Sequence, residues 1–277
     1  TVLENLNTVI NKGEMIALSG NSGSSGGPHL HFEIRNTKTE HPINPLSLGL
    51  KITDNIPPTL RNIKLYSISE STINGEKKDQ IFNLKKDRKN YSIEEDITIN
   101  GEFSIGISAY DRLNNSSNKN GVYKIQLYVD SIMYYEFEVD ELDFSTSRYI
   151  NAHIDYKEYK THHIKYHRCF KLSNNRLTNY KTIKNEGIIK FDDYESHFIE
   201  IKVIDFHKNT SSLTFKVKSD IEKDLTKTNQ EQTNLYKSFS YFQPNIFKEQ
   251  DVEIHMEQYS LYESLQFEYN SIDSVKE

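Results

Sequence analysis

Residues 122–139 read VYKIQLYVDSIMYYEFEV and carry the clearest structural pattern of the chain. Two runs rich in aromatic and β-branched side chains, 122–129 and 133–139, flank Asp130-Ser131. Such residues favour strands, and two strand-like runs joined by a short polar connection predict a β-hairpin. The centre of the chain is therefore expected to form an antiparallel sheet.

Further strand-like segments lie on both sides of this hairpin. Phe103, Ile105 and Ile107 occupy alternate positions, which places them on one face of a strand. Residues 199–205 and 213–217 predict a second strand pair. Most of the chain is therefore expected to be β-structure.

The ends of two of these strands carry an aspartate. Asp111 and Asp205 each lead into a stretch of Asn and hydroxyl residues, whose side chains can bond the backbone of a turn. We interpret both as turn-forming rather than as calcium ligands, because no acidic residues at alternate positions accompany them. Residues 57–220 are expected to form an immunoglobulin-like β-sandwich region, either one elaborated domain or two small ones, in which 145–180 is a helix or an irregular insertion.

The rest of the sequence divides at proline-rich and polar stretches. Residues 1–50 contain short strands and glycine-rich turns, and the Pro57-Pro58 pair suggests a domain junction. Residues 221–235 are polar and are expected to be a linker, and 236–277 are expected to begin a further β-domain. The predicted fold class is all-β.

Composition excludes several classes of protein. The net charge is -6, whereas a protein that binds duplex nucleic acid usually carries a basic excess. No apolar run approaches the ~18 residues of a membrane helix, so we expect no transmembrane segment in this chain. Cys169 is the single cysteine and cannot form an internal disulfide.

Candidate chemistry is concentrated in residues 20–35, which read GNSGSSGGPHLHFEIR. If the second half is a strand, His29, His31, Glu33 and Arg35 share one side, opposite an apolar side. The two imidazoles then lie roughly 6–7 Å apart along the strand, so that one can bind a metal while the other faces metal-bound water. Such pairs more often have a structural role, but here the preceding Gly/Ser loop would open a groove for an extended peptide.

This segment closely resembles the end of the zinc domain of peptidase family M23, the LytM/lysostaphin-like metallopeptidases. Family members carry Gly-x-Ser/Thr-Gly-x-Ser-Thr-Gly-Pro-His-Leu-His-Phe-Glu at this place, and residues 10–17 match the strand that precedes this loop in the family. In this sequence we expect residues 14–19 to form a short, mostly buried strand. The resemblance covers roughly residues 1–50, which would be the C-terminal part of an M23-type β-sheet peptidase domain. The layout downstream resembles multidomain members of the Bacteroidetes type.

The resemblance implies a zinc endopeptidase that acts on peptidoglycan peptide cross-links. It makes His31 a zinc ligand and His29 the catalytic partner that assists the metal-bound water or the tetrahedral intermediate. Glu33 and Arg35 are expected to form a structural ion pair. The partner is then peptidoglycan or a cell-wall peptide, in the cell envelope, periplasmic or extracellular, with a signal peptide upstream.

The sequence also departs from the family pattern. Family members complete the zinc site with a further His and an Asp in a His-x3-Asp motif, and no His occurs from Thr1 to Pro28. A catalytic zinc ordinarily takes three protein ligands plus water. We therefore expect a chain truncated at its N-terminus that is inactive alone. Gly26 replaces a common Thr, which removes one hydroxyl without inactivating the site.

Two alternatives remain open for the function. The first is a non-catalytic cell-envelope binding or regulatory module with a degenerate peptidase domain, although retention of both His29 and His31 argues against it. The second is an adhesin-like role of the β-domains, residues 57–277.

A second group of histidines, near Cys169, is a weaker candidate. His163 and His167 would share a face if their segment were helical, which is the geometry of a metal pair. Because Lys165 and Arg168 are interleaved with them, we interpret the segment as a solvated polar face.

Overall fold

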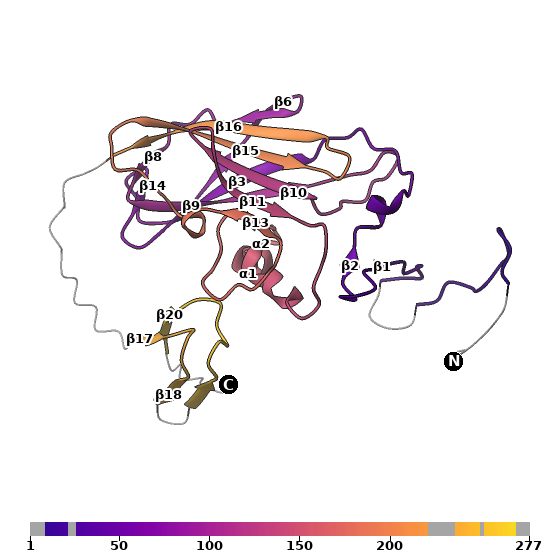
Figure 1. Cartoon of the computed structure of the whole chain (residues 1–277). Coiled ribbons are helices and arrows are strands. Elements are labelled where there is room, and N and C mark those ends of the chain that lie inside the picture. The colour runs from indigo at the N-terminus through magenta and orange to yellow at the C-terminus, as the bar shows by residue number, and fades with distance from the viewer. Residues whose placement is uncertain (1–8, 22–25, 221–235, 250–251, 270–277) are drawn as a thin grey trace, which may run out of the picture.

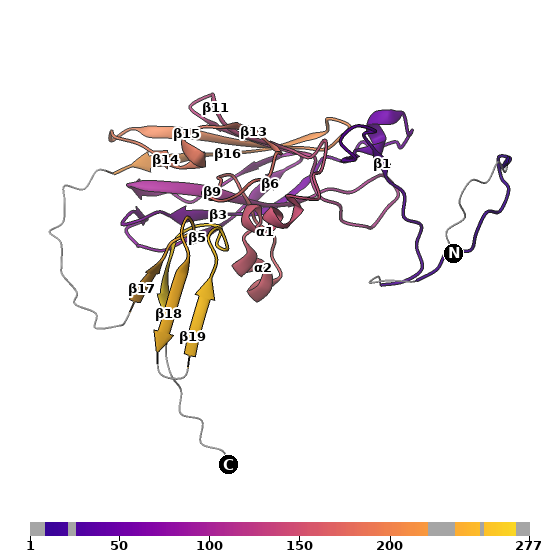
Figure 2. The same ribbon diagram turned by 60° about the horizontal axis from the view of Figure 1, so that its bottom comes forward.

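The computed structural model describes residues 9–21, 26–220, 236–249 and 252–269 (Figure 1). Strands dominate this part of the chain, so the predicted all-β class is confirmed. Two large sheets pack face to face (Figures 1 and 2), and small hairpins lie at both ends of the described sequence.

The larger sheet is built around the predicted hairpin. Its main strands run in the order β13-β11-β10-β15-β16-β7-β6, and β8 and β4 extend it beyond β16. Their bounds are β13 Tyr180–Ile183, β11 Ile132–Glu138, β10 Lys124–Val129, β15 Ser196–Ile204, β16 Thr210–Ser219, β7 Asn90–Ser92, β6 Lys85–Asp87, β8 Thr98–Asn100 and β4 Thr72–Ile73. Pairs along the chain are antiparallel, but β16 pairs in parallel with β7 and with β8.

The smaller sheet has the order β12-β9-β3-β5, with β14 also paired to β9. Its strands are β12 His167–Arg168, β9 Glu102–Tyr110, β3 Thr59–Ser67, β5 Gln80–Asn83 and β14 Ile189–Lys190. The long central pair of β3 and β9 is antiparallel and contains one register shift. β9 is therefore the central strand of this sheet and pairs with β12, β3 and β14.

The turn of the β10–β11 hairpin has the conformation that its position requires. Val129 pairs with Ile132, so that Asp130 and Ser131 alone form the connection. Both have positive φ, 49° and 68°, as in a type I′ turn, whose twist matches that of the flanking strands. The predicted hairpin is confirmed, and the predicted pair at 199–205 and 213–217 is also present as β15 and β16.

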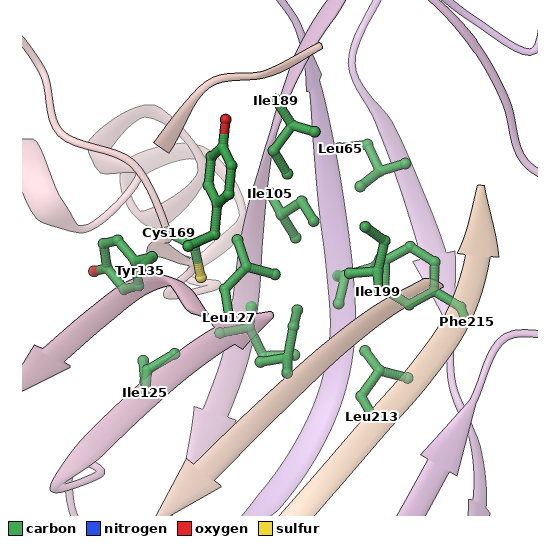
Figure 3. Close-up of a cluster of buried hydrophobic side chains, with 14 of the residues drawn as sticks. Leu65, Ile105, Ile125, Leu127, Tyr135, Cys169, Ile189, Ile199, Leu213 and Phe215 are labelled. Carbon is green, nitrogen blue, oxygen red and sulfur yellow. The ribbon is translucent and has the colours of Figure 1, made fainter. Parts of the chain in front are cut away.

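One hydrophobic core lies between the two sheets, and Figure 3 shows part of it. Leu65 and Ile105 of the smaller sheet meet Leu127, Ile199 and Leu213 of the larger one, and all five are fully buried. The predicted alternation of Phe103, Ile105 and Ile107 is confirmed, because all three face this core. Burial of one such side chain contributes about 1.5–3 kcal/mol.

Short helices occupy the predicted insertion at 145–180. They are η2 Ser147–Tyr149, α1 Ile150–His153 and α2 Tyr156–His162, and a further turn, η3 Asn185–Gly187, follows later. Asp155 caps α2 because its side chain accepts a hydrogen bond from the Glu158 amide. The helix ends at His163, which has a left-handed backbone conformation.

The N-terminal segment contains little regular structure. It forms β1 Ile34–Arg35 and β2 Pro42–Ile43, which pair with each other, followed by the turn η1 Pro45–Leu48. The predicted strand at 14–19 is not formed in the structure, and its apolar side chains are exposed rather than buried, with Leu18 86% exposed. The predicted strand 29–35 is reduced to Ile34–Arg35. A strand needs a partner for its backbone groups, and no described segment pairs with these residues.

The C-terminal segment consists of two antiparallel pairs, β17 Tyr236–Phe239 with β20 Leu265–Glu268, and β18 Asn245–Glu249 with β19 Val252–Met256. Phe239 stacks on Phe267 at 4.7 Å between ring centroids, and Phe247 meets the same ring edge-on. Figure 2 shows these strand pairs beside the helical insertion. The strand pattern expected here is present, and the proposed domain divisions remain predictions.

Candidate functional site

The histidine motif lies on an exposed, extended stretch of chain. Leu30 is 86% and Phe32 60% exposed, so the side expected to be apolar and covered faces solvent. Nδ1 of His29 lies 3.0 Å from the carbonyl oxygen of Gly27. A carbonyl can only accept a hydrogen bond, so Nδ1 carries the proton and Nε2 of a neutral His29 keeps its lone pair. That nitrogen is therefore free to accept a proton.

His31 and the two charged residues after it are linked by contacts. His31 Nε2 lies 3.6 Å from Glu33 Oε2, and Glu33 Oε1 accepts hydrogen bonds from Arg35 Nε at 2.8 Å and Nη2 at 2.5 Å. The expected Glu33–Arg35 ion pair is thus confirmed. The hydrogen bond from Arg35 lowers the pKa of Glu33, which keeps the carboxylate ionised beside the imidazole.

The strand end that follows the motif is attached to the sandwich. The Arg35 guanidinium lies 5.1 Å from the centre of the Phe144 ring, and the Pro42 carbonyl accepts a hydrogen bond from the Leu142 amide at 2.9 Å. His41 Nδ1 lies 2.7 Å from Glu141 Oε1. These contacts hold residues 34–44 against the loop after β11, whereas His29 and His31 lie beyond them.

The described residues around His31 do not make up a catalytic zinc site on their own. His31 offers one imidazole and Glu33 one carboxylate, whereas such a site takes three protein ligands and a water. Within the described ranges, the one group of three possible metal ligands lies elsewhere, at Asp54, Asp205 and His207. The expectation that this chain is inactive alone and the assignments of His29 and His31 all remain predictions.

A groove of about 570 Å³ lies between the helical insertion and the end of β9. Among its lining residues are Arg61, Lys119, Lys165, Tyr110, Tyr156 and Tyr159, and the lining contains no Asp or Glu. Lys119 Nζ and Lys165 Nζ each lie about 5 Å from the centre of a tyrosine ring. A basic, aromatic groove of this kind suits a ligand that combines carboxylates with flat or apolar faces.

The segment that contains His163 and His167, which the sequence predicts to be a solvated polar face, is only partly helical. His163 ends α2 and His167 begins β12, and both line the groove. His167 Nδ1 lies 3.0 Å from Nε2 of the fully buried His153, and burial lowers the pKa of His167 to about 4. The predicted solvated polar face is present only as far as Lys165, because Tyr166 and Cys169 are fully buried. His167 is neutral near pH 7.

Sequence reasoning missed a buried ion network that joins β3 to the helical insertion. Lys64 Nζ lies 3.1 Å from Asp155 Oδ2, 3.0 Å from Glu158 Oε1 and 3.1 Å from Asp79 Oδ2. The Tyr66 hydroxyl donates to the same Asp155 oxygen at 2.9 Å. Lys64 could have revealed this network, because it lies within a strand pattern of apolar residues and a buried charge needs a partner.

Comparison with known families finds a similarity in the N-terminal segment. The model of peptidase family M23 matches residues 3–45, which confirms the resemblance drawn from the Gly/Ser loop and the His-Leu-His motif. No curated protein and no solved structure matches the chain. No helix in the described ranges is both long and apolar enough to cross a membrane.

Proposed function

We propose that this chain contributes the His29-Leu30-His31 segment to an M23-type zinc endopeptidase that cleaves peptidoglycan peptide cross-links in the cell envelope. The observation that carries the proposal is the family match over residues 3–45, which contains both histidines. In this proposal His31 supplies one zinc ligand. His29, whose Nε2 keeps its lone pair, supplies a proton acceptor beside the reacting groups.

The remaining ligands have to come from another polypeptide segment, since the described residues near His31 provide too few. The exposed apolar side chains Met15, Ile16, Leu18, Leu30 and Phe32 support this reading. A segment packed on them would pair with the extended backbone at 14–19 and 29–33 and turn both into sheet strands. Covering each side chain would contribute about 1.5–3 kcal/mol, which offsets part of the entropy cost of ordering that segment.

The test uses the protein encoded by the complete reading frame, assayed for zinc content and for release of peptides from purified peptidoglycan. His31→Ala should lose the bound zinc and lower the cleavage rate at least about a hundredfold, because one of the protein ligands of the zinc ion is removed. His29→Ala should keep the zinc and lower the rate by about 10²–10⁴-fold, the usual contribution of a general base.

The matched control is His255→Ala, which removes an exposed imidazole of the C-terminal hairpins. It should leave zinc content and rate unchanged. If His31→Ala keeps full activity, the ligand assignment is wrong. If the complete protein holds zinc but cleaves no peptide bond, the endopeptidase assignment fails.

The groove favours a second candidate, a module that binds wall polymer without cleaving it. Its three basic side chains and its tyrosines could hold the carboxylates and apolar faces of stem peptides. In a sedimentation assay with insoluble peptidoglycan, the double variant K119A/K165A should bind several-fold more weakly than the unaltered chain, and added salt should narrow the difference. Equal binding by both proteins would exclude the groove as the binding surface.

A further inference from the structure

The groove between the helical insertion and the end of β9 has two walls of different chemistry. The wall formed by the insertion is apolar and aromatic, and Ile150 and Tyr159 on it are 42% and 36% exposed. The other wall is built from β3, the end of β9 and residues 111–121, and it carries Arg61 and Lys119. A ligand that fits between these walls combines an apolar body with a negatively charged group.

A β-bulge gives Arg61 its place in this groove. Leu60 and Asn62 of β3 pair with the consecutive residues 108–109 of β9, which leaves Arg61 without a partner in the register. Such a bulge bends the strand and redirects the side chain of the extra residue. Arg61 is accordingly exposed and lines the groove, in a strand whose other residues are mostly buried.

The two lysines of the groove are positioned by its own tyrosines. Lys119 belongs to the loop 111–120, whose end residues exchange two backbone hydrogen bonds of 3.0 and 2.8 Å. Its Nζ lies 5.0 Å from the centre of the Tyr110 ring, and Lys165 Nζ lies 5.3 Å from the centre of the Tyr159 ring. Both tyrosines line the groove, so the ammonium groups are held at its surface.

The three cations of the groove have no partner of opposite charge. None of Arg61, Lys119 and Lys165 forms an ion pair with a carboxylate of the described residues. Elsewhere in the sandwich, Lys64 and Lys124 are paired with carboxylates. The chain has a net charge of -6, so acidic side chains are abundant, and yet none lines the groove. Its positive charge is therefore available to an anion from outside the chain.

We propose that this groove binds the free carboxyl end of an extended peptide. The guanidinium of Arg61 has parallel N–H donors that match the two oxygens of a carboxylate, and the ammonium groups add positive charge. The side-chain amides of Asn120 and Asn151 also line the groove, and they offer the donors and acceptors that peptide groups need. A volume of about 570 Å³ admits a few residues of a peptide but not a folded protein.

The inference rests on the wall-binding function proposed above for the source of this peptide. When water hydrolyses a peptide bond, the C–N bond breaks, the carbonyl carbon gains a hydroxyl group and the nitrogen gains a hydrogen. One fragment then ends in a carboxylate and the other in an ammonium group. The groove attracts the first and repels the second, so it would hold the protein at wall peptides whose carboxyl ends are free.

Titration of the full chain with two matched peptides, followed by NMR, tests the inference. N-acetyl-tetraalanine and its C-terminal amide differ only in the charge of the carboxyl end. The acid should bind about tenfold more tightly than the amide, because a charged acceptor strengthens the hydrogen bonds. Arg61→Gln should remove most of this preference. Arg61→Lys should restore only part of it, since an ammonium group cannot form the paired contact.

The matched control is K216A/K218A, which removes two exposed lysines of β16 and changes the net charge as K119A/K165A does. The control should bind the acid peptide like the unaltered chain, whereas K119A/K165A should bind it several-fold more weakly. The inference is overturned if the acid and the amide bind equally, if the control weakens binding as much, or if inorganic phosphate binds as tightly as the acid peptide.

The two experiments on the groove separate this inference from the function on which it rests. If K119A/K165A weakens binding to peptidoglycan but the acid and the amide bind equally, only the carboxyl-end inference fails. If the acid is preferred but K119A/K165A sediments with peptidoglycan like the unaltered chain, the carboxyl-end inference holds and the wall-binding function fails.

Discussion

Buried ionisable side chains concentrate in the helical insertion and the strands beneath it. Burial raises the pKa of Asp155, but Arg168, the Glu158 amide and Lys64 more than offset it, so the pKa is lowered overall. Beside this network, His153 stacks on Phe137 at 3.9 Å between ring centroids and contacts His167. Charged and neutral groups thus lie side by side, each with its protonation state set by burial and by its partners.

The imidazole pair should make stability depend on pH. Burial places the pKa of His167 at about 4 and that of His153 well below the ordinary 6.5. The unfolded chain takes up protons below pH 6.5 and the folded chain does not, so this stability is complete above pH 6.5 and is lost as pH falls toward 4. Each histidine contributes a slope of up to about 1.4 kcal/mol per pH unit.

His167→Gln tests this slope while keeping a hydrogen-bonding side chain opposite His153. In urea denaturation at pH 7, 6 and 5, the variant should lose less stability than the unaltered chain as pH falls. Comparing the two proteins cancels the contribution of Asp111, whose raised pKa acts in the opposite direction. Parallel curves for the two proteins would contradict the prediction, and the exposed-site variant His255→Ala should follow the unaltered chain.

Turns decide the pairing of neighbouring strands in this protein. The β10–β11 connection holds Ser131 at a φ of 68°, a region that costs a non-glycine residue roughly 1–2 kcal/mol. Glycine adopts that conformation without this cost but loses more chain entropy on folding, about 0.5–1 kcal/mol. The neighbouring Asp130 is different, because its side chain accepts a hydrogen bond from the Phe198 amide and pairs with His197.

Ser131→Gly should therefore raise the free energy of unfolding by a few tenths to about 1 kcal/mol. Ser131→Ala is the control and should bring no gain, since alanine keeps the Cβ that opposes positive φ. Chemical denaturation of the three proteins measures the differences. An equal loss of stability in both variants would show that the serine hydroxyl supports the turn, and a larger loss in Ser131→Gly than in Ser131→Ala would contradict the prediction.

Local patterns were enough to predict the elements whose partners are close in sequence. The alternation in 122–139 and its two-residue turn led to the correct hairpin, and the same holds for β15 and β16. The parallel pairing of β16 with β7 and β8 was not predictable, because short strands more than a hundred residues away carry no shared periodicity. The same separation hid the approach of Asp54 to Asp205.

Around the histidine motif, by contrast, the sequence predicted strands that are mostly not formed in the structure. The composition of residues 14–19 and 29–35 favours strands, but strand formation depends on a neighbouring strand that no pattern in the segment itself can supply. His29 and His31 were found from their motif, and the family match agrees with it. Their environment was beyond prediction, since it depends on what packs on Leu30 and Phe32.

At the scale of the whole molecule, the chain combines a well-packed sandwich with exposed extended residues at its N-terminal side (Figure 1). Hydrogen exchange followed by mass spectrometry should distinguish the sandwich from these exposed residues. Amides of residues 14–20 and 29–33 should exchange within seconds at neutral pH, and those of β3, β9 and β15 should be protected for hours or longer. Protection of residues 29–33 in the isolated chain would contradict the extended conformation.

The same hydrogen-exchange measurement also tests whether a further segment packs on the histidine motif, as the proposed peptidase requires. In the protein encoded by the complete reading frame, residues 29–33 should become protected, because a segment packed on Leu30 and Phe32 would pair with their backbone. Exchange in β15 serves as the internal reference and should not change.

The place of β16 in the larger sheet has a consequence for biosynthesis. β16 lies between β15 and the short strands β7 and β8, so among the described strands the two halves of this sheet are joined by residues 210–219 alone. At a synthesis rate of about 5–20 residues per second, the nascent chain exposes β7 and β8 for several seconds before β16 has been made. During that interval their edges can pair with other chains, and a holding chaperone would protect them until the last strand closes the sheet.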